Sequence, residues 1–224
     1  MATGVPSSKP LAPGPIALTA ADLPPMGDSP EATRFDLSTL WPADRRDRPI
    51  EIEIGSGKGT FLVQQATATA EVNFLGVEWA AQYCRHAADR MRRHGLDHVR
   101  MLRADAAEFV RWYVADLCVR QVHVYFPDPW PKKRHHKRRL IQPPFLRELN
   151  RILVPGGRVR LVTDHADYFA WMEQAVAEVG ELFERRPFER PIGAAEGEVV
   201  GTNFERKYRR EGRLFQGMTL AKRG

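Results

Sequence analysis

"EIEIGSGKGTF", residues 51–61, is the stretch that decides the fold. Its first four residues continue from Ile50, and this run from Ile50 to Ile54 predicts a β-strand. The residues from Thr60 to Ala70 predict an α-helix. Glycines at positions 55, 57 and 59 lie in the connecting turn, where glycine permits a tight bend and a close approach of a ligand to the main chain. The stretch therefore predicts a strand–turn–helix unit whose turn faces a ligand.

The chain beyond this unit repeats the alternation of strand and helix. We expect strands at residues 73–78, 99–105, 121–126 and 157–164, and helices at residues 80–94, 106–115, 140–151 and 166–179. Units of this length form right-handed crossovers onto a mostly parallel sheet with helices on both faces. Residues 212–222 alternate weakly and predict further strands at the sheet edge. The predicted fold class is α/β, doubly wound and Rossmann-like.

Acidic residues stand where the predicted strands end. In an open α/β sheet, ligands bind outside the carboxyl ends of the strands. Polar residues at these ends are therefore expected to line one pocket. The acidic residues at the five ends are Glu53, Glu78, Asp105, Asp128 and Asp164.

The spacing of the glycines distinguishes between nucleotide-like ligands. A phosphate-binding P-loop needs glycine in place of Ile52 and Ser or Thr in place of Gly59, and a dinucleotide site needs glycine in place of Thr60. The observed spacing instead resembles motif I of class I S-adenosylmethionine-dependent methyltransferases. Glu78 follows at the distance where an acid accepts ribose hydroxyls, and Asp105 is expected on the adenine side. An ordinary tight turn is the alternative interpretation.

A second unusual stretch, "VYFPDPWPKKRHHKRR", spans residues 124–139. Its prolines prevent a strand or helix from continuing, so the segment after Phe126 is expected to be a loop. The loop holds Asp128 between two prolines, next to Trp130 and a basic run. Between residues 85 and 151 there are 16 Lys and Arg against 7 Asp and Glu, which indicates a polyanionic partner. A solvated charged surface is the alternative.

Together these segments resemble the bacterial-type tRNA (guanine-N(7)-)-methyltransferase family. The resemblance also includes "FLGVE", "LVTDHADYFAWM" and "GTNFERKYRREG", and it extends from about residue 51 to residue 212. It implies methyl transfer from S-adenosylmethionine to N7 of guanosine 46 in the variable loop of tRNA. The proline-rich N-terminus lies outside it.

The matching motifs imply specific site residues. Cofactor contacts are expected at Glu53, Glu78, Asp105 and Asp128, with Asp128 also catalytic, and the turn adds Gly55, Gly57 and Gly59. Substrate contacts are expected at Lys132, Asp164, Thr202, Asn203, Phe204 and Glu205. RNA contacts are expected at Arg134, His135, His136, Lys137, Arg138 and Arg139.

The chemistry requires positioning more than proton transfer. The guanine nitrogen already carries a lone pair, so Asp128 is expected to orient the base and stabilise its developing positive charge. Asp164 and Glu205 are candidates to accept the paired donors of the guanine edge. Glu205 could equally pair with Arg209, four residues later on a helix. Trp130 is expected either to pack within the loop or to stack on a base.

Composition sets the remaining expectations. The chain has 224 residues, 43% of them hydrophobic, a net charge of +6 and two unpaired cysteines. This predicts a proline-rich flexible tail over residues 1–33, which hold seven prolines, and one folded domain over residues 34–224. The family resemblance implies that this is a methyltransferase domain. A cytoplasmic location without a membrane segment is expected, and the histidines lack the partners of a metal site. The family resemblance implies a monomer or a homodimer.

Two other functions fit part of the pattern. Amino-methyltransferases acting on adenine or cytosine also carry a proline-rich acid–aromatic loop after the fourth strand. Their pattern has two adjacent prolines before the aromatic residue, whereas here Pro129 alone separates Asp128 from Trp130. A non-catalytic RNA-binding protein with the same fold is the second alternative.

Overall fold

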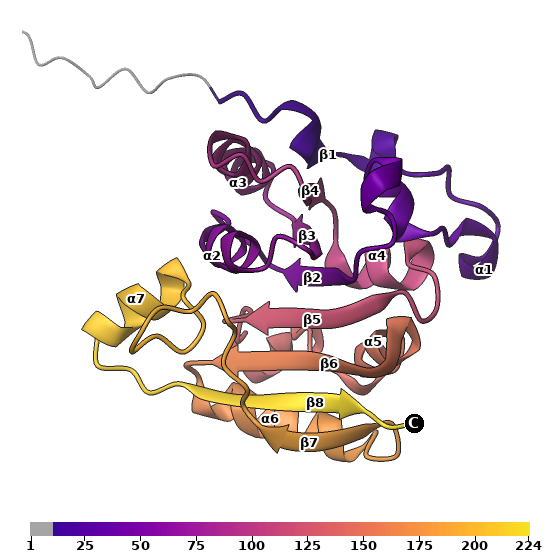
Figure 1. Cartoon of the computed structure of the whole chain (residues 1–224). Helices are drawn as coiled ribbons and strands as arrows, with labels where there is room; N and C mark the ends of the chain where they lie inside the picture. The colour runs from indigo at the N-terminus through magenta and orange to yellow at the C-terminus, as the bar shows by residue number, and fades with distance from the viewer. Residues whose placement is uncertain (1–10) are drawn as a thin grey trace, which may run out of the picture.

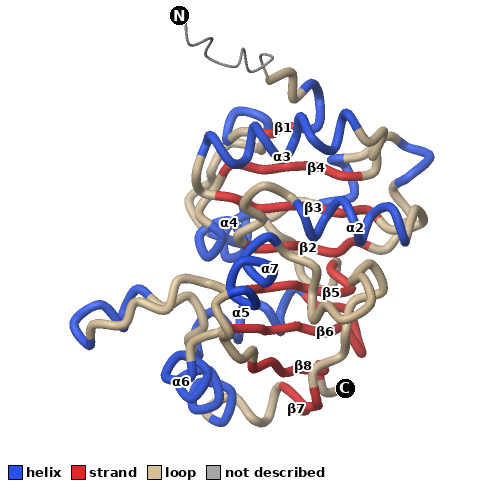
Figure 2. The backbone as a smooth tube through the Cα atoms, turned by 90° about the vertical axis from the view of Figure 1, so that its left-hand side faces the viewer, coloured by secondary structure: helices blue, strands red, loops and turns tan. Residues whose placement is uncertain are grey.

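The computed structural model describes residues 11–224, which form one eight-stranded sheet with helices on both faces (Figure 1). The spatial order of the strands is β1-β4-β3-β2-β5-β6-β8-β7, which Figure 2 shows from top to bottom. The strands are β1 (Ala17–Leu18), β2 (Ile50–Ile54), β3 (Asn73–Glu78), β4 (Val99–Arg103), β5 (Val119–Tyr125), β6 (Leu153–Thr163), β7 (Phe183–Pro187) and β8 (Gln216–Lys222). All neighbouring strands from β1 to β6 pair in parallel, whereas β8 is antiparallel to both β6 and β7. The prediction of a doubly wound, mostly parallel sheet is confirmed.

The helices divide between the two faces of the sheet. They are α1 (Pro30–Thr33), α2 (Thr60–Ala68), α3 (Ala81–Arg93), α4 (Ala106–Tyr113), α5 (Pro143–Ile152), α6 (Ala166–Ala177) and α7 (Asn203–Arg210). One hydrophobic core joins the sheet to α4, α5 and α6, and a second joins it to α2 and α3. Neighbouring strand residues alternate between the two cores, as Phe74 and Leu75 do, because successive side chains of a strand point to opposite faces.

Three elements differ from the sequence expectation: β8, β7 and α5. The predicted edge strand, β8, lies inside the sheet between β6 and β7. The edge is β7, which was not predicted because only Phe183 of its five residues is buried. An exposed edge strand has no apolar alternation by which to recognise it. Helix α5 begins at Pro143 rather than Leu140, because a proline is tolerated only in the first turn of a helix.

The segment before β2 also contacts the sheet. The expected flexible tail covers all residues up to 33, of which residues 1–10 lie outside the described residues. In the described part, β1 pairs with β4, Ile16 is buried, and the main-chain amide of Ala12 donates to Asp89 (3.1 Å). Main-chain pairing and the burial of Ile16 hold this segment, and neither is visible in its proline content.

The strand order favours a ligand-binding crevice at the carboxyl ends of the parallel strands. From β2 the chain moves outward through β3 and β4, and it then returns to the other side of β2 to form β5 and β6. Ligands bind at the carboxyl ends where the order reverses in this way. In Figure 1 the arrowheads of β2, β5 and β6 point to the left, toward α7. Within residues 11–224 no helix is both long and apolar enough to cross a membrane.

Candidate active site

The glycine turn after β2 has the left-handed backbone that its composition predicts. Gly55, Gly57 and Gly59 all have positive φ, at 76°, 52° and 68°. A side chain at Gly59 would also collide with α3, since its Cβ would lie 2.6 Å from the Met91 side chain. The turn is tied to the end of β3, because the amide of Gly57 donates to Glu78 Oε2 (2.9 Å). The turn is therefore a rigid main-chain surface beside a carboxylate.

Glu53 is a buried carboxyl group with spare hydrogen-bonding capacity. It lies on β2 with 3% of its surface exposed, and its Oε2 has no hydrogen-bond partner within the described part of the chain. Burial raises the pKa of Glu53 to about 8, while a hydrogen bond from Ser56 opposes this shift and the charge of Glu78 adds to it. Glu53 lines a cavity of about 450 Å³. A buried, unpaired carboxyl group that lines a cavity is suited to a cationic ligand.

A second cavity, of about 460 Å³, brings together three of the predicted acidic residues. Its walls include Glu78, Asp105 and Asp128. Both cavities are lined by Gly55, Gly57, Tyr83, Tyr125 and Phe204. Because they share these walls, the two cavities form one cleft, and we refer to them together as the cleft.

Two of the acids at the cleft are held by main-chain donors. Glu78 Oε1 accepts from the amide of Ala80 (2.8 Å) in addition to the bond with the glycine turn. Asp105 is the N-cap of α4 and accepts from the amide of Glu108 (2.9 Å). A carboxylate has about four acceptor positions, so both keep capacity for a ligand.

The loop that carries Asp128 is conformationally strained. Phe126 and Trp130, on either side of the Pro-Asp-Pro sequence, have positive φ values of 53° and 44°. Such values are rare for bulky residues and persist only where the surrounding structure holds them. The amide of Phe126 donates to the carbonyl of Val162 (2.8 Å), and its ring packs against Phe215. Asp128 is exposed at the rim of the cleft.

The predicted substrate residues near α7 line one wall of the cleft. Thr202, Asn203 and Phe204 line the Glu53 cavity, and Thr202 caps α7 by accepting from the amide of Glu205 (3.0 Å). Lys132 lies apart from them, exposed on the loop that follows Asp128.

Glu205 lies in a different environment from the one that guanine recognition would need. Its side chain is fully buried and accepts from the amides of Val199, Val200 and Gly201 at 2.6–2.8 Å and from Arg209 at 2.6 Å. Burial alone would raise the pKa of Glu205, but these donors together lower it below the ordinary value. All four acceptor positions are thus occupied. The predicted pairing with Arg209 exists, although the carboxylate is buried rather than on a helix surface.

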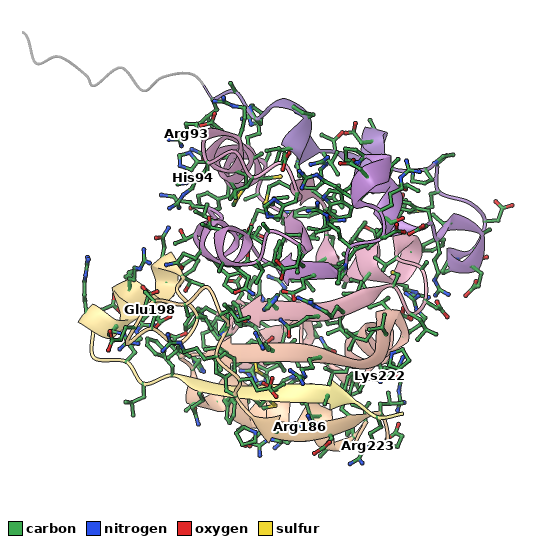
Figure 3. All side chains as sticks on the ribbon, in the orientation of Figure 1. Arg93, His94, Arg186, Glu198, Lys222 and Arg223 are labelled. Carbon is green, nitrogen blue, oxygen red and sulfur yellow. The ribbon has the colours of Figure 1, made fainter. Side chains whose placement is uncertain are left out.

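Asp164 directly follows the last residue of β6. Its Oδ2 pairs with Arg213 (2.5 Å), and 12% of its side chain is exposed. The loop before α7 is held by a separate ion pair between Glu198 and Arg206 (2.7 Å), and Figure 3 labels Glu198 beside that helix.

The basic run does not face solvent uniformly. Lys137 and Arg138 are exposed, and so is Arg134. Arg139, in contrast, has 1% of its side chain exposed, and its guanidinium lies between the loop and α6. This position does not favour its predicted contact with RNA, because a buried guanidinium has little surface to offer a phosphate.

The aromatic residues of the loop contact its basic side chains. Arg138 lies over the ring of Trp130 (5.0 Å), which His135 also contacts edge-on (5.8 Å). His136 packs against Trp171 of α6 (5.6 Å). Trp130 thus packs within the loop, as one of its two predicted roles requires, and it also lines the cleft. In residues 11–224, no group of three or more His, Cys, Asp or Glu side chains could hold a metal ion.

Two tyrosines that line the cleft, Tyr83 and Tyr125, were not among the predicted site residues. Tyr125 ends β5, and its hydroxyl lies 2.7 Å from His123 Nδ1, while Tyr83 projects from α3. Burial raises the pKa of Tyr125 well above its ordinary value. The position of Tyr125 at a strand end, directly before the proline loop, is the signal that would have identified it.

Proteins of known sequence resemble this chain over most of its length. A family model described as "Putative methyltransferase" matches residues 47–216. A tRNA (guanine-N(7)-)-methyltransferase of Halorhodospira halophila is 40% identical over 185 residues, covering 83% of this chain and 78% of that protein. A protein of the same description from Alkalilimnicola ehrlichii is 35% identical over 209 residues, covering 84% and 85% of the two chains.

Solved structures resemble the chain in fold. An rRNA methylase from Streptococcus thermophilus superimposes with a TM-score of 0.53 and 14% identity, over 80% of this chain and 89% of that one. A SAM-dependent methyltransferase from Aquifex aeolicus gives a TM-score of 0.51 and 11% identity, over 78% and 81%. At such identities the likeness concerns the fold alone.

Proposed function

The chain belongs to the tRNA (guanine-N(7)-)-methyltransferase family, and on this premise we propose that its cleft methylates N7 of guanosine 46 in the variable loop of tRNA. One observation carries the proposal. Glu78, Asp105 and Asp128, from three different strand ends, line the same cleft as Glu53, whose Oε2 has no hydrogen-bond partner among residues 11–224. A cleft with these acids suits a nucleoside cofactor that carries positive charge.

The residues of the cleft fit S-adenosylmethionine. Glu53 offers a buried carboxyl group to an ammonium, and Gly55 and Gly57 leave the main chain accessible. Glu78 stands where an acid can accept ribose hydroxyls, and Asp105 would face the adenine side. When bound, S-adenosylmethionine supplies a methyl group that its sulfonium charge makes electrophilic. The acids and the glycine turn together support the binding of this cofactor in the cleft.

We assign Asp128 an electrostatic and orienting role. The guanine nitrogen attacks with its own lone pair, so no side chain has to remove a proton, and positioning dominates the rate. Positive charge then develops on the purine ring, and a fixed carboxylate nearby stabilises it. Pro127 and Pro129 restrict the backbone on either side of Asp128. A rigid carboxylate needs no reorganisation as the charge appears.

Of the two candidate acids, Asp164 and Glu205, we assign selection of the base to Asp164. Guanine offers a ring N–H and an amino group on one edge, and a carboxylate can accept both. Glu205 has no free acceptor position, because the main chain before α7 and Arg209 occupy all of them. We assign Glu205 to the shape of that loop, and Thr202, Asn203 and Phe204 to the cleft wall that faces the substrate.

The exposed basic side chains suit the tRNA backbone. Arg134, Lys137 and Arg138 lie on the loop that begins at the rim of the cleft. Lysine and arginine contacts to phosphates give affinity without base specificity. The loop would hold the tRNA strand while the cleft selects the base, in the cytoplasm and as a monomer or homodimer.

Analysis of digested tRNA tests the reaction. After incubation with tRNA and S-adenosylmethionine, mass spectrometry should detect 7-methylguanosine, and we expect Asp128→Asn to slow its formation about 100-fold or more. Calorimetry should still show cofactor binding by this variant. Asp44→Asn, an exposed change outside the cleft, is the matched control. A methylated exocyclic amine would support an amino-methyltransferase instead, and no cofactor binding by the native chain would support a non-catalytic protein.

A further inference from the structure

We propose that Arg139 is a positioning residue, which anchors the Asp128 loop to α6 and does not contact RNA. The proposal rests on the function proposed above, since it concerns the geometry of Asp128. It separates Arg139 from Arg138, its neighbour in the same basic run. The two residues differ in burial and in the groups that they contact.

The contacts of Arg139 connect the loop to the first turn of α6. Its Nε donates to the carbonyl of Pro129 (2.9 Å), the residue directly after Asp128. Its Nη2 pairs with Asp167 of α6, and the guanidinium lies 5.0 Å from the ring of Tyr168 and 5.1 Å from that of Trp171. A single side chain therefore holds the loop carbonyl, a carboxylate and two aromatic rings.

The loop has few other means of attachment. Pro127, Pro129 and Pro131 have no amide hydrogen to donate, so the loop depends on donors from elsewhere. Within residues 11–224, the bond from Arg139 is the only hydrogen bond to the main chain of residues 127–131. Phe126 and Trp130 have left-handed backbones, whose strain the surroundings must offset. Arg139 is placed to do so.

The aromatic partners of Arg139 also fix the chain beyond the loop. The hydroxyl of Tyr168 accepts from the amide of Ile141 (3.2 Å), and the indole of Trp171 donates to the carbonyl of Ile141 (2.8 Å). The segment is thus held on α6 at Arg139 and at Ile141, and Pro129 is connected to α6 through Arg139. Arginine suits the position because its planar fork can bond two acceptors and stack on rings at once, whereas a lysine cannot.

The test compares Arg139→Lys with Arg138→Ala in single-turnover methylation at saturating tRNA. For Arg139→Lys we expect the rate to fall roughly 10- to 100-fold through misplacement of Asp128. Its affinities for S-adenosylmethionine and tRNA, and the salt dependence of tRNA binding, should stay unchanged. Arg138→Ala should weaken tRNA binding and lower the slope of log affinity against log salt by about 0.7–1.

Two results would overturn the proposal. One is a folded Arg139→Lys protein with the native rate, and the other is an Arg139→Lys protein whose tRNA affinity and salt slope fall as those of Arg138→Ala do. If Arg139→Lys does not fold, Asp167→Asn decides, because its exposed side chain tolerates the change. We expect a smaller rate loss of the same kind, and an unchanged rate would refute the anchor.

Hydrogen exchange separates this proposal from the function itself. If the native protein forms no 7-methylguanosine, the proposed function fails. The anchor is then judged by exchange in peptides covering residues 126–142, measured by mass spectrometry. Exchange should accelerate in Arg139→Lys and in Asp167→Asn and stay native in Arg138→Ala. Equal exchange in all of these proteins would contradict the anchor.

Discussion

Glu53 and Glu205 are both buried glutamates, but they differ in the hydrogen-bond donors that surround their carboxyl groups. Glu205 is surrounded by donors that the chain itself provides, whereas one oxygen of Glu53 has no donor among residues 11–224. A carboxylate without donors is costly to keep charged in a buried site, so the proton is retained to higher pH. We therefore propose the free oxygen of Glu53 as a ligand position and assign the saturated carboxylate of Glu205 a structural role.

The raised pKa of Glu53 predicts a pH dependence of cofactor binding. Below about pH 8 the carboxyl group keeps its proton, and an ammonium ligand favours the ionised form. Binding should therefore release a proton, and affinity should rise from pH 6 to 8 and then level off. The unliganded protein should lose stability as pH rises from the unfolded pKa, about 4.5, to 8, because the folded state binds more protons over this range.

Calorimetry in two buffers of different ionisation enthalpy measures the released proton. Glu53→Gln should weaken binding and remove the pH dependence, because the amide has no proton to lose. Tyr83→Phe, which keeps the ring at the wall of the cleft, is the control and should retain the pH dependence. Affinity independent of pH in the native protein would contradict the assignment of Glu53.

Replacing Glu205 should lower the free energy of unfolding, because its carboxylate is a structural group. Glu205→Gln substitutes an amide nitrogen for an acceptor among three main-chain donors, and we expect a loss of about 2–4 kcal/mol in the free energy of unfolding. Urea denaturation measures it, with the exposed Glu196→Gln as control. Since the folded pKa is lowered, this stabilisation is present above the unfolded pKa of about 4.5 and disappears as pH falls through the folded value. Equal stability of both variants would show that the loop does not need the carboxylate.

At the scale of elements, the segment that contains β1 extends the sheet beyond β4. A two-residue strand contributes few hydrogen bonds, so its attachment depends on the burial of Ile16 against α3 and on the bond between Ala12 and Asp89. Arg92 of α3 adds a bond to the carbonyl of Ala12 (2.5 Å). These contacts connect the N-terminal segment to the face of the sheet that α2 and α3 cover.

Ile16 and Leu11 provide a matched pair of changes in this segment. Ile16 is 5% exposed and Leu11 is 40% exposed. Ile16→Ala should lower the free energy of unfolding by about 2–3 kcal/mol, because it leaves a cavity, whereas Leu11→Ala should change it by less than about 0.5 kcal/mol. Chemical denaturation compares the two. A similar small effect from both would show that the segment does not hold to the sheet.

At the scale of the whole molecule, the basic loop and the cleft lie at the same end of the sheet, where the parallel strands have their carboxyl ends. The crossover topology brings the carboxyl ends of β2, β3, β4 and β5 together, so the acids that follow them converge. The loop after β5 carries both Asp128 and the exposed cations. We therefore propose that the fold couples the binding of tRNA by the exposed cations to the presentation of one base at the cleft.

The salt dependence of tRNA binding tests this arrangement. Replacing Arg134 and Lys137 together with Ala should reduce the slope of log affinity against log salt by about 0.7–0.9 for each phosphate that the variant no longer neutralises. Arg186→Ala is the control, since Figure 3 places Arg186 on β7 at the far edge of the sheet. An unchanged slope in the double variant, or an equal change in Arg186→Ala, would contradict binding by the loop.

Much of the architecture was predictable because its signals are local. The run from Ile50 to Ile54 and the glycines after it specify a strand and a turn through neighbouring residues alone, and the structure has both at those positions. The meeting of Glu78, Asp105 and Asp128 followed from the rule for parallel strand ends. The strand β7 escaped prediction because an exposed edge needs no apolar pattern.

By itself the sequence determined the alternating strands and helices from β2 to α6, the glycine turn after β2 and the family to which the chain belongs. Only the tertiary structure decided which charged residues are free to bind. Arg138 and Arg139 are adjacent and chemically identical, yet one is exposed and the other is enclosed by α6. The physical reason is that burial and hydrogen bonding depend on groups distant in the sequence, here Asp167, Tyr168 and Trp171.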